Sequence, residues 1–209
     1  LTLVVYDGVN GTTPTSRIAA NQGLLEDTWY HVAVTRDSSN LVTMYLDGVS
    51  QGTWASTNFW TGGSGSSMGG QNNTGAPELG SQGGSNNMTG YLQDWRWYTT
   101  CKYTNSFQPQ TPINFTSKGL TTTVSDDGSV TAAGTRTDSN ASSIVLAVPF
   151  NGVLTDRSAD VKGSGTNLSS NGTGSTSFTS DPLFYGKAQM FQNTRTTYNS
   201  SSFNVGTGA

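Results

Sequence analysis

The stretch from Glu26 to Gly48 constrains the fold of this chain more than any other. Two runs rich in β-branched and aromatic residues, 29–36 and 41–46, flank a polar turn at 37–40, a pattern typical of a β-hairpin. Alternate residues of each run are apolar, so one face suits a core and the other suits water or a less dry layer. The expected apolar face consists of Tyr30, Val32, Val34, Val42, Met44 and Leu46.

A second turn follows at once, at Asp47-Gly48, and leads to a further strand over 49–54. Aspartate followed by glycine is a strong signal for a two-residue hairpin turn, because both positions need a positive φ. The sequence therefore predicts two consecutive hairpins that share their central strand.

These residues also resemble a known family. The order Trp29, His31-Val32-Ala33-Val34, Arg36 and then Tyr45-x-Asp47-Gly48 is similar to the signature hairpin of laminin-G-like domains in the concanavalin A-like lectin/glucanase superfamily. Segments 89–96, 102–104 and 107–109 are similar to the closing strand and exit of such domains in phage and bacterial surface proteins, with Gln93 in place of the usual Asp. The resemblance implies an all-β fold, an antiparallel β-sandwich of jelly-roll type.

Composition agrees with an all-β chain and excludes several partners. Small polar residues suit short strands joined by many turns, and 21 aromatic residues (5 Trp, 8 Tyr and 8 Phe) argue against wholesale disorder. The net charge of −3 and the scattered Lys and Arg predict no nucleic-acid partner. No apolar run is long enough for a membrane span. The single cysteine, Cys101, excludes an internal disulfide framework.

The halves of the chain are predicted to be out of order. Residues 1–113 resemble the C-terminal part of a laminin-G-like domain, 114–143 form a Ser/Thr/Gly-rich linker, and 144–209 resemble the N-terminal part of such a domain. Either the chain is a window of a longer tandem array, or the last segment completes a permuted sandwich, in cis or from a neighbouring copy. Either piece alone would expose apolar faces and strand edges, so we expect strand pairing between them.

The strongest strand after the hairpin runs from Tyr91 to Tyr98. Strict alternation would place Tyr91, Trp95 and Trp97 on one face, which makes the two tryptophans candidates for the core. The same alternation predicts that Asp94 and Arg96 form a surface ion pair of little stabilising value.

The sequence offers no carboxylate pair for glycoside hydrolysis. That reaction needs two acids facing each other across the scissile bond, and the only glutamates are Glu26 and Glu78. The single histidine, His31, lies in the hairpin motif, where we expect it to be packed or hydrogen-bonded at an edge, with a catalytic role as the less favoured alternative. We therefore predict a chain that is not an enzyme.

Calcium is the cofactor that the resemblance suggests, because laminin-G-like domains often bind it at a rim through carboxylates and carbonyl oxygens. The candidate ligands here are Asp126, Asp127, Asp156 and Asp160. The alternative is that these residues are solvated turn formers, since aspartate is common in Ser- and Thr-rich turns.

A glycan-binding site is suggested by a cluster of aromatic and amide side chains. Sugar rings stack on aromatic faces while amides reach hydroxyl groups, and a loop can present both. The candidates are Trp54, Asn58, Phe59 and Trp60. The alternative role for the aromatic members is core packing.

As the resemblance implies, we predict a non-catalytic structural or adhesion module of a larger extracellular, cell-surface or virion-associated protein. Its partners would be a glycan or cell-surface ligand, and other copies of the protein or neighbouring repeats. The alternative function is a carbohydrate-binding module attached to a polysaccharide-degrading enzyme.

Overall fold

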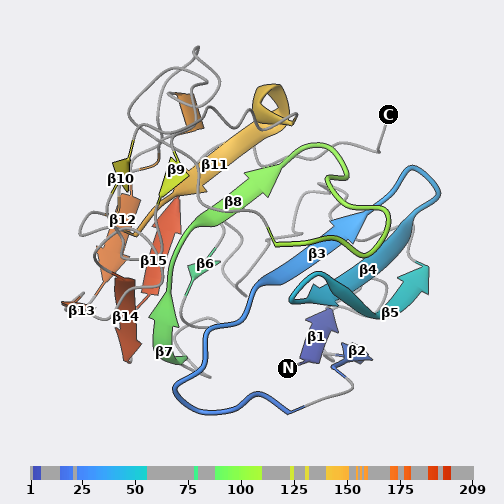
Figure 1. Cartoon of the computed structure of the whole chain (residues 1–209), viewed down its shortest axis with the longest axis horizontal. Helices are drawn as coiled ribbons and strands as arrows, with labels where there is room; N and C mark the ends of the chain where they lie inside the picture. The colour runs from blue at the N-terminus through green and yellow to red at the C-terminus, as the bar shows by residue number, and fades with distance from the viewer. Residues whose placement is uncertain are drawn as a thin grey trace. The chain divides into compact units, whose positions relative to one another are not determined.

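The computed structural model (Figure 1) describes most of the predicted strands and the segments that join some of them. The described residues are 2–5, 15–20, 23–55, 78–79, 88–109, 123–124, 130–131, 140–150, 154, 156, 158–159, 170–173, 177–179, 188–192 and 195–198. They are rich in antiparallel strands and contain almost no helix. Within these ranges no helix has the length and apolar character needed to cross a membrane.

The chain divides into two compact units that do not follow sequence order. Unit 1 consists of Leu1–Gly63, Thr100–Gln110 and Asn204–Ala209, and unit 2 consists of Ser64–Thr99 and Thr111–Phe203. Each unit therefore contains segments that are distant in the sequence.

Unit 1 is built on a three-stranded antiparallel sheet in the order β3 (Val32–Arg36), β4 (Leu41–Leu46), β5 (Val49–Ala55). It also contains the antiparallel pair β1 (Thr2–Val5) and β2 (Thr15–Ala19). Both predicted hairpins are confirmed, because β3 pairs with β4 and β4 pairs with β5.

Local hydrogen bonds explain why the first hairpin turns where it does. The Asp37 carboxylate accepts hydrogen bonds from the backbone N–H groups of Ser39 and Leu41, both at 2.9 Å. Asn40 has a φ of 64°, a left-handed conformation that asparagine adopts more readily than most residues. The second turn places Asp47 at φ 50° and Gly48 at φ 77°, as a type I′ turn requires.

Strand β4 is buried on both faces, which differs from the predicted single apolar face. Val42, Met44 and Leu46 are buried on the predicted face. Gly52 of β5 pairs with Met44, and a Cβ atom built on Gly52 would lie 3.2 Å from the side chain of Ile18 in β2. Tyr45 points to the opposite face and is only 1% exposed. The segment 100–109, which we call the strap, covers Tyr45, and the local alternation could not reveal this second cover.

The described strands of unit 2 form four small antiparallel sheets. Two have three strands: one has the order β12 (Ser170–Thr173), β15 (Arg195–Tyr198), β6 (Glu78–Leu79), and the other has the order β13 (Ser177–Thr179), β14 (Ala188–Gln192), β7 (Thr89–Leu92). The third pairs β11 (Ile144–Val148) with β8 (Trp95–Tyr98), and the fourth pairs β9 (Thr123–Val124) with β10 (Val130–Thr131). The 3-10 helix η1 (Ala141–Ser143) directly precedes β11.

The core of unit 2 lies between β11, β14 and the β7–β8 segment. Its fully buried members are Leu146, Val148, Phe150 and Phe191, and both tryptophans of β8 pack against them. The rings of Phe150 and Phe191 meet edge to face, with centroids 6.0 Å apart. The prediction that Trp95 and Trp97 face the core is therefore confirmed.

The prediction that Tyr91 shares that face is wrong. In β7 the core-facing side chains are Met88 and Leu92, whereas Tyr91 is 41% exposed. Between the two strands Asp94 has a φ of 56°, and this irregularity shifts the alternation by one residue. A shift of one residue moves every following side chain to the other face.

The Asp94–Arg96 pair is confirmed as a pair but not as a surface one. The guanidinium donates to both carboxylate oxygens, with Nε 2.8 Å from Oδ1. Arg96 is 10% exposed and Asp94 is 11% exposed. Burial makes breaking such a pair costly, since the remaining partner would keep an uncompensated charge.

Strands of the last segment pair with strands of the first in unit 2. β11 pairs with β8, β14 with β7, and β15 with β6. Within 114–143, the predicted linker, β9 pairs with β10. The assignment of 1–113 and 144–209 to two parts of laminin-G-like domains stays a prediction, because these pairings do not identify the domain to which each part belongs.

Candidate functional site

Two hydrogen bonds join the residue before β3 to the turn after β4, at a position that we call the corner. The N–H of His31 donates to Oδ1 of Asp47 at 2.8 Å, and the N–H of Asp47 donates to the carbonyl oxygen of His31 at 2.8 Å. In the first bond the Asp47 carboxylate is the acceptor, so this side chain stabilises the hairpin.

An aromatic cluster sits above this corner, on the Tyr45 side of the sheet. Tyr103 and Phe107 of the strap stack with their ring centroids 3.5 Å apart. Phe107 meets the rings of His31 at 5.4 Å and Tyr45 at 5.3 Å, both in edge-to-face geometry. His31 therefore has the packed role that we predicted for it.

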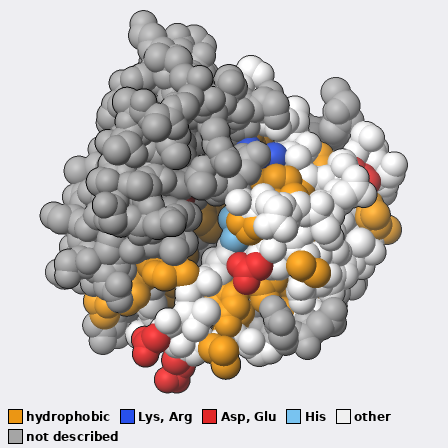
Figure 2. All heavy atoms as spheres, in the orientation of Figure 1, with side chains coloured by type: hydrophobic (Ala, Val, Ile, Leu, Met, Phe, Trp, Pro, Cys, Tyr) orange, Lys and Arg blue, Asp and Glu red, His pale blue; other side chains and the backbone are white. Residues whose placement is uncertain are grey.

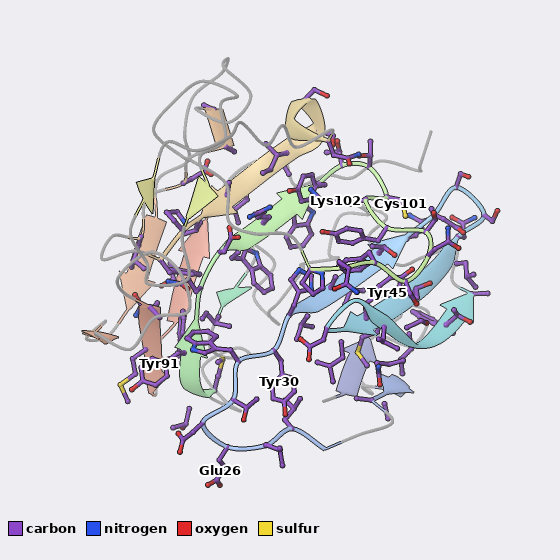
Figure 3. All side chains as sticks on the ribbon, viewed as in Figure 1. Glu26, Tyr30, Tyr45, Tyr91, Cys101 and Lys102 are labelled. Atoms are coloured by element: carbon purple, nitrogen blue, oxygen red, sulfur yellow. The ribbon has the colours of Figure 1, made fainter. Side chains whose placement is uncertain are left out.

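Two further contacts hold the strap on the sheet. The N–H of Phe107 donates to the carbonyl oxygen of Gly48 at 2.9 Å, and the Tyr45 hydroxyl donates to the carbonyl oxygen of Tyr103 at 3.4 Å. Within the strap itself, the Cys101 thiol donates to the same carbonyl at 3.3 Å. Figure 3 labels Tyr45 and Cys101 in this part of unit 1. Sequence reasoning placed the strap at the exit of the domain but missed its role, because no local pattern connects it with Tyr45.

The Cys101 thiol is half-buried and free of a disulfide. Its pKa is raised above the ordinary value of a thiol, chiefly because burial disfavours the thiolate, while hydrogen bonds with Thr35 and Tyr103 act in the opposite direction. A thiol that resists ionisation is a poor nucleophile and a poor metal ligand.

Of the predicted glycan-binding residues, the structure describes Trp54. This residue stands near the end of β5, directly opposite Val42, and therefore shares the buried face of the sheet. Its side chain is half-buried, so it contributes to packing and keeps an accessible part. Asn58, Phe59 and Trp60 lie outside the described residues, and the structure does not test whether the four come together.

Of the predicted calcium ligands, the structure describes Asp156. Its carboxylate is fully buried, and Oδ1 accepts hydrogen bonds from the N–H groups of Ala147 and Ser158, both at 2.9 Å. Oδ2 accepts from the Ser158 hydroxyl at 2.8 Å. Asp156 thus fastens the chain after β11 to that strand. Asp126, Asp127 and Asp160 lie outside the described residues.

Four of the described aspartates accept hydrogen bonds that stabilise the fold. Asp37 organises a turn, Asp47 binds the backbone of His31, Asp94 binds Arg96, and Asp156 binds three donors. In the part of the chain that the structure describes, no group of three or more His, Cys, Asp or Glu side chains is arranged to hold a metal ion.

The fold and these contacts define a class of protein: an all-β chain whose acids and aromatic rings stabilise hairpins and a covering strap. The comparison with known families gives this class a name. Residues 3–106 match the family model of the concanavalin A-like lectin/glucanases superfamily, in its laminin-G branch, and this part of the chain belongs to that superfamily. The predicted concanavalin A-like antiparallel sandwich is thereby confirmed. No curated protein and no solved structure matches the chain.

Membership in this superfamily defines a general function. The fold is one of carbohydrate binding and adhesion, laminin-G-like domains are usually non-catalytic, and they commonly occur in extracellular or surface proteins. The fold itself does not select a ligand, since one sandwich serves many functions.

Proposed function

We propose that the chain is a non-catalytic structural or adhesion module of a larger extracellular or virion-associated protein, and that it contacts glycans through Trp54, Asn58, Phe59 and Trp60. Its other partners would be further copies of the protein or neighbouring repeats.

The hydrogen bonds that the aspartates accept within the protein are the observation that supports a binding role. Glycoside hydrolysis needs one carboxylic acid that can donate a proton and one carboxylate that can attack or activate water. Asp47, Asp94 and Asp156 instead accept hydrogen bonds from the chain's own backbone and side chains. Carboxylates held in this way suit a scaffold that presents its loops.

The location of the glycan contact is proposed from Trp54 and the sequence that follows it. Trp54 is half-buried near the end of β5, so its backbone is anchored in the sheet while part of the residue stays accessible. The next residues supply two more aromatic rings and an amide, Phe59, Trp60 and Asn58. Aromatic rings with a nearby amide are the side chains that bind sugar faces and hydroxyl groups.

A glycan array followed by titration of the best binder tests this proposal. We expect Trp60→Ala to reduce the affinity at least tenfold, while Tyr91→Ala, which removes an exposed aromatic ring from unit 2, leaves it unchanged. An array without any binder, or equal affinities for the two variants, would refute the glycan contact.

The alternative function is a carbohydrate-binding module attached to a polysaccharide-degrading enzyme, which the same fold would support. The two functions differ in the ligand. An attached module would bind the insoluble polysaccharide that its enzyme degrades, whereas an adhesion module would bind cell-surface glycans. Pull-down with cellulose, chitin and xylan, compared with binding to whole cells, separates them.

A further inference from the structure

The described part of unit 1 exposes five large aliphatic side chains within residues 24–49, of which Leu41 lies at the opposite end of β4 from Val32 and Val49. Leu24 is 44% exposed, Leu25 71%, Val32 48% and Val49 58%. We call these four residues the docking face. Isolated exposed aliphatic residues are normal on proteins, but a group of them points to an interaction surface.

The strand register brings two of these residues onto one side of the sheet. Val32 of β3 lies opposite Leu46 of β4, and Leu46 lies opposite Val49 of β5. Side chains directly opposite each other in a sheet project from the same face. Val32 and Val49 therefore flank the buried Leu46 in a single row across the three strands.

A hydrogen bond holds the other two residues near the start of β3. The N–H of Leu25 donates to the hydroxyl of Tyr30 at 3.0 Å, and Tyr30 precedes Val32 by two residues. Figure 3 labels Tyr30 together with Glu26, which follows Leu25 in this segment. The backbone of Leu25, which follows Leu24, is thus held at the side chain of Tyr30, two residues before Val32.

Acidic side chains lie next to residues of the docking face and of its central strand in the sequence. Glu26 and Asp27 follow the two leucines, and Asp47 follows Leu46; all three are exposed. Within 23–55 the single cationic side chain, Arg36, donates to the side-chain oxygen of Asn40. Figure 2 shows hydrophobic and acidic side chains among the residues that it colours by type.

From this combination we propose that the docking face binds a peptide segment of a partner protein in which aliphatic or aromatic residues are flanked by lysines or arginines. The aliphatic residues would bury against the four exposed side chains, and the cations would pair with Glu26, Asp27 and Asp47. A second copy of this chain would bring the same acids to the same face, and like charges oppose such an arrangement. A nucleic acid is repelled for the same reason, and a glycan finds few aromatic rings on this face.

The size of the docking face determines the strength of the interaction. Four partly exposed side chains form a small contact compared with the roughly 800 Å² per partner of a standard stable interface. The complex is therefore transient, with a dissociation constant in the micromolar range or above. Its cationic component makes it sensitive to salt, because charges at a solvent-exposed rim are screened.

Selection from a random peptide display library on the immobilised full chain tests the proposal. We expect the enriched peptides to combine apolar residues with Lys or Arg. The most enriched peptide is then synthesised with a fluorescent label, and its affinity is measured by anisotropy for the parent and three variants.

The double variant Leu25→Ser with Val49→Ser removes apolar area at two exposed positions and should weaken binding at least tenfold. The double variant Glu26→Gln with Asp27→Asn removes two charges and should weaken binding about threefold or more at low salt and much less at about 0.5 M salt. Asn is suitable at position 27 because it tolerates the positive φ of 53° found there. Tyr91→Ser, at an exposed position in unit 2, is the matched control and should bind as the parent does.

Three results would overturn the proposal: no enriched peptide, enriched peptides without cationic residues, or a peptide whose affinity is the same for the parent and for the Leu25/Val49 variant. Circular dichroism of each variant establishes that a loss of binding reflects the surface and not unfolding.

Discussion

Gly48 is the position where a single added methyl group should disturb unit 1 most. A Cβ atom built on Gly48 would lie 1.8 Å from the carbonyl oxygen of Phe107 and 2.8 Å from its carbonyl carbon. These are backbone atoms, so no side-chain rotation relieves the overlap. The φ of 77° at Gly48 adds a second cost for any L-residue with a side chain.

The expected magnitude follows from the contacts that the strap would lose. The left-handed conformation costs about 1–2 kcal/mol for alanine. Displacement of Phe107 breaks its hydrogen bond with Gly48, about 1 kcal/mol, and weakens its contacts with the rings of His31 and Tyr45, about 0.5–1.5 kcal/mol each. Gly48→Ala should therefore destabilise the protein by about 3–6 kcal/mol, a large part of the 5–15 kcal/mol typical of a folded domain.

Urea denaturation followed by tryptophan fluorescence measures this loss. Gly23→Ala is the matched control, because a Cβ at Gly23 would have no atom within 4 Å and should change stability little. A double-mutant cycle with Phe107→Ala provides a second check: once Gly48→Ala has displaced the strap, removing the Phe107 ring should cost much less than in the parent. Equal stability of the Gly48 and Gly23 variants would refute the close approach of the strap.

Three further predictions concern other parts of the chain. Trp95→Ala should destabilise the protein by about 2–4 kcal/mol in thermal melts, because Trp95 packs on the unit 2 core. Tyr91→Ala should cost under about 1 kcal/mol, because Tyr91 is exposed. Equal costs would contradict the finding that the two side chains lie on opposite faces. Asp156→Ala should cost about 3 kcal/mol or more, because it leaves buried donors without an acceptor, and EDTA should leave the melting temperature of the parent unchanged; a melting temperature that rises with added calcium would show that the predicted metal site exists. Because burial raises the pKa of Cys101, the protonated thiol contributes stability that is fully present below the ordinary thiol pKa of about 8.5 and is lost as the pH rises through the higher folded-state pKa; Cys101→Ser should thus lose less stability than the parent as the pH rises above about 8.5, and identical pH profiles would contradict it.

The hairpins were predictable because their signals are local. The polar turn at 37–40 and the pair Asp47-Gly48 are recognised from neighbouring residues, and both turns form where expected. Alternation likewise identified the buried side of β4, and the family signature of the hairpin was confirmed over 3–106.

Errors arose where one residue or one distant segment reversed the local pattern. The positive φ of Asp94 moved Tyr91 away from the face of Trp95 and Trp97, although strict alternation had grouped them. The Asp94–Arg96 pair, predicted at the surface, is nearly buried. For the candidate sites, the structure adds that Trp54 lies opposite Val42 and that Asp156 accepts buried hydrogen bonds; the glycan and calcium roles of these residues stay predictions.

The sequence by itself determined the all-β character, the positions of the main strands and turns, and the superfamily, because alternation and turn chemistry act between residues a few positions apart. Only the tertiary structure decided that the strap covers Tyr45, that Gly48 must lack a side chain, and that β11 pairs with β8. Those outcomes depend on contacts between segments tens of residues apart, and the order of residues within either segment does not specify its partner.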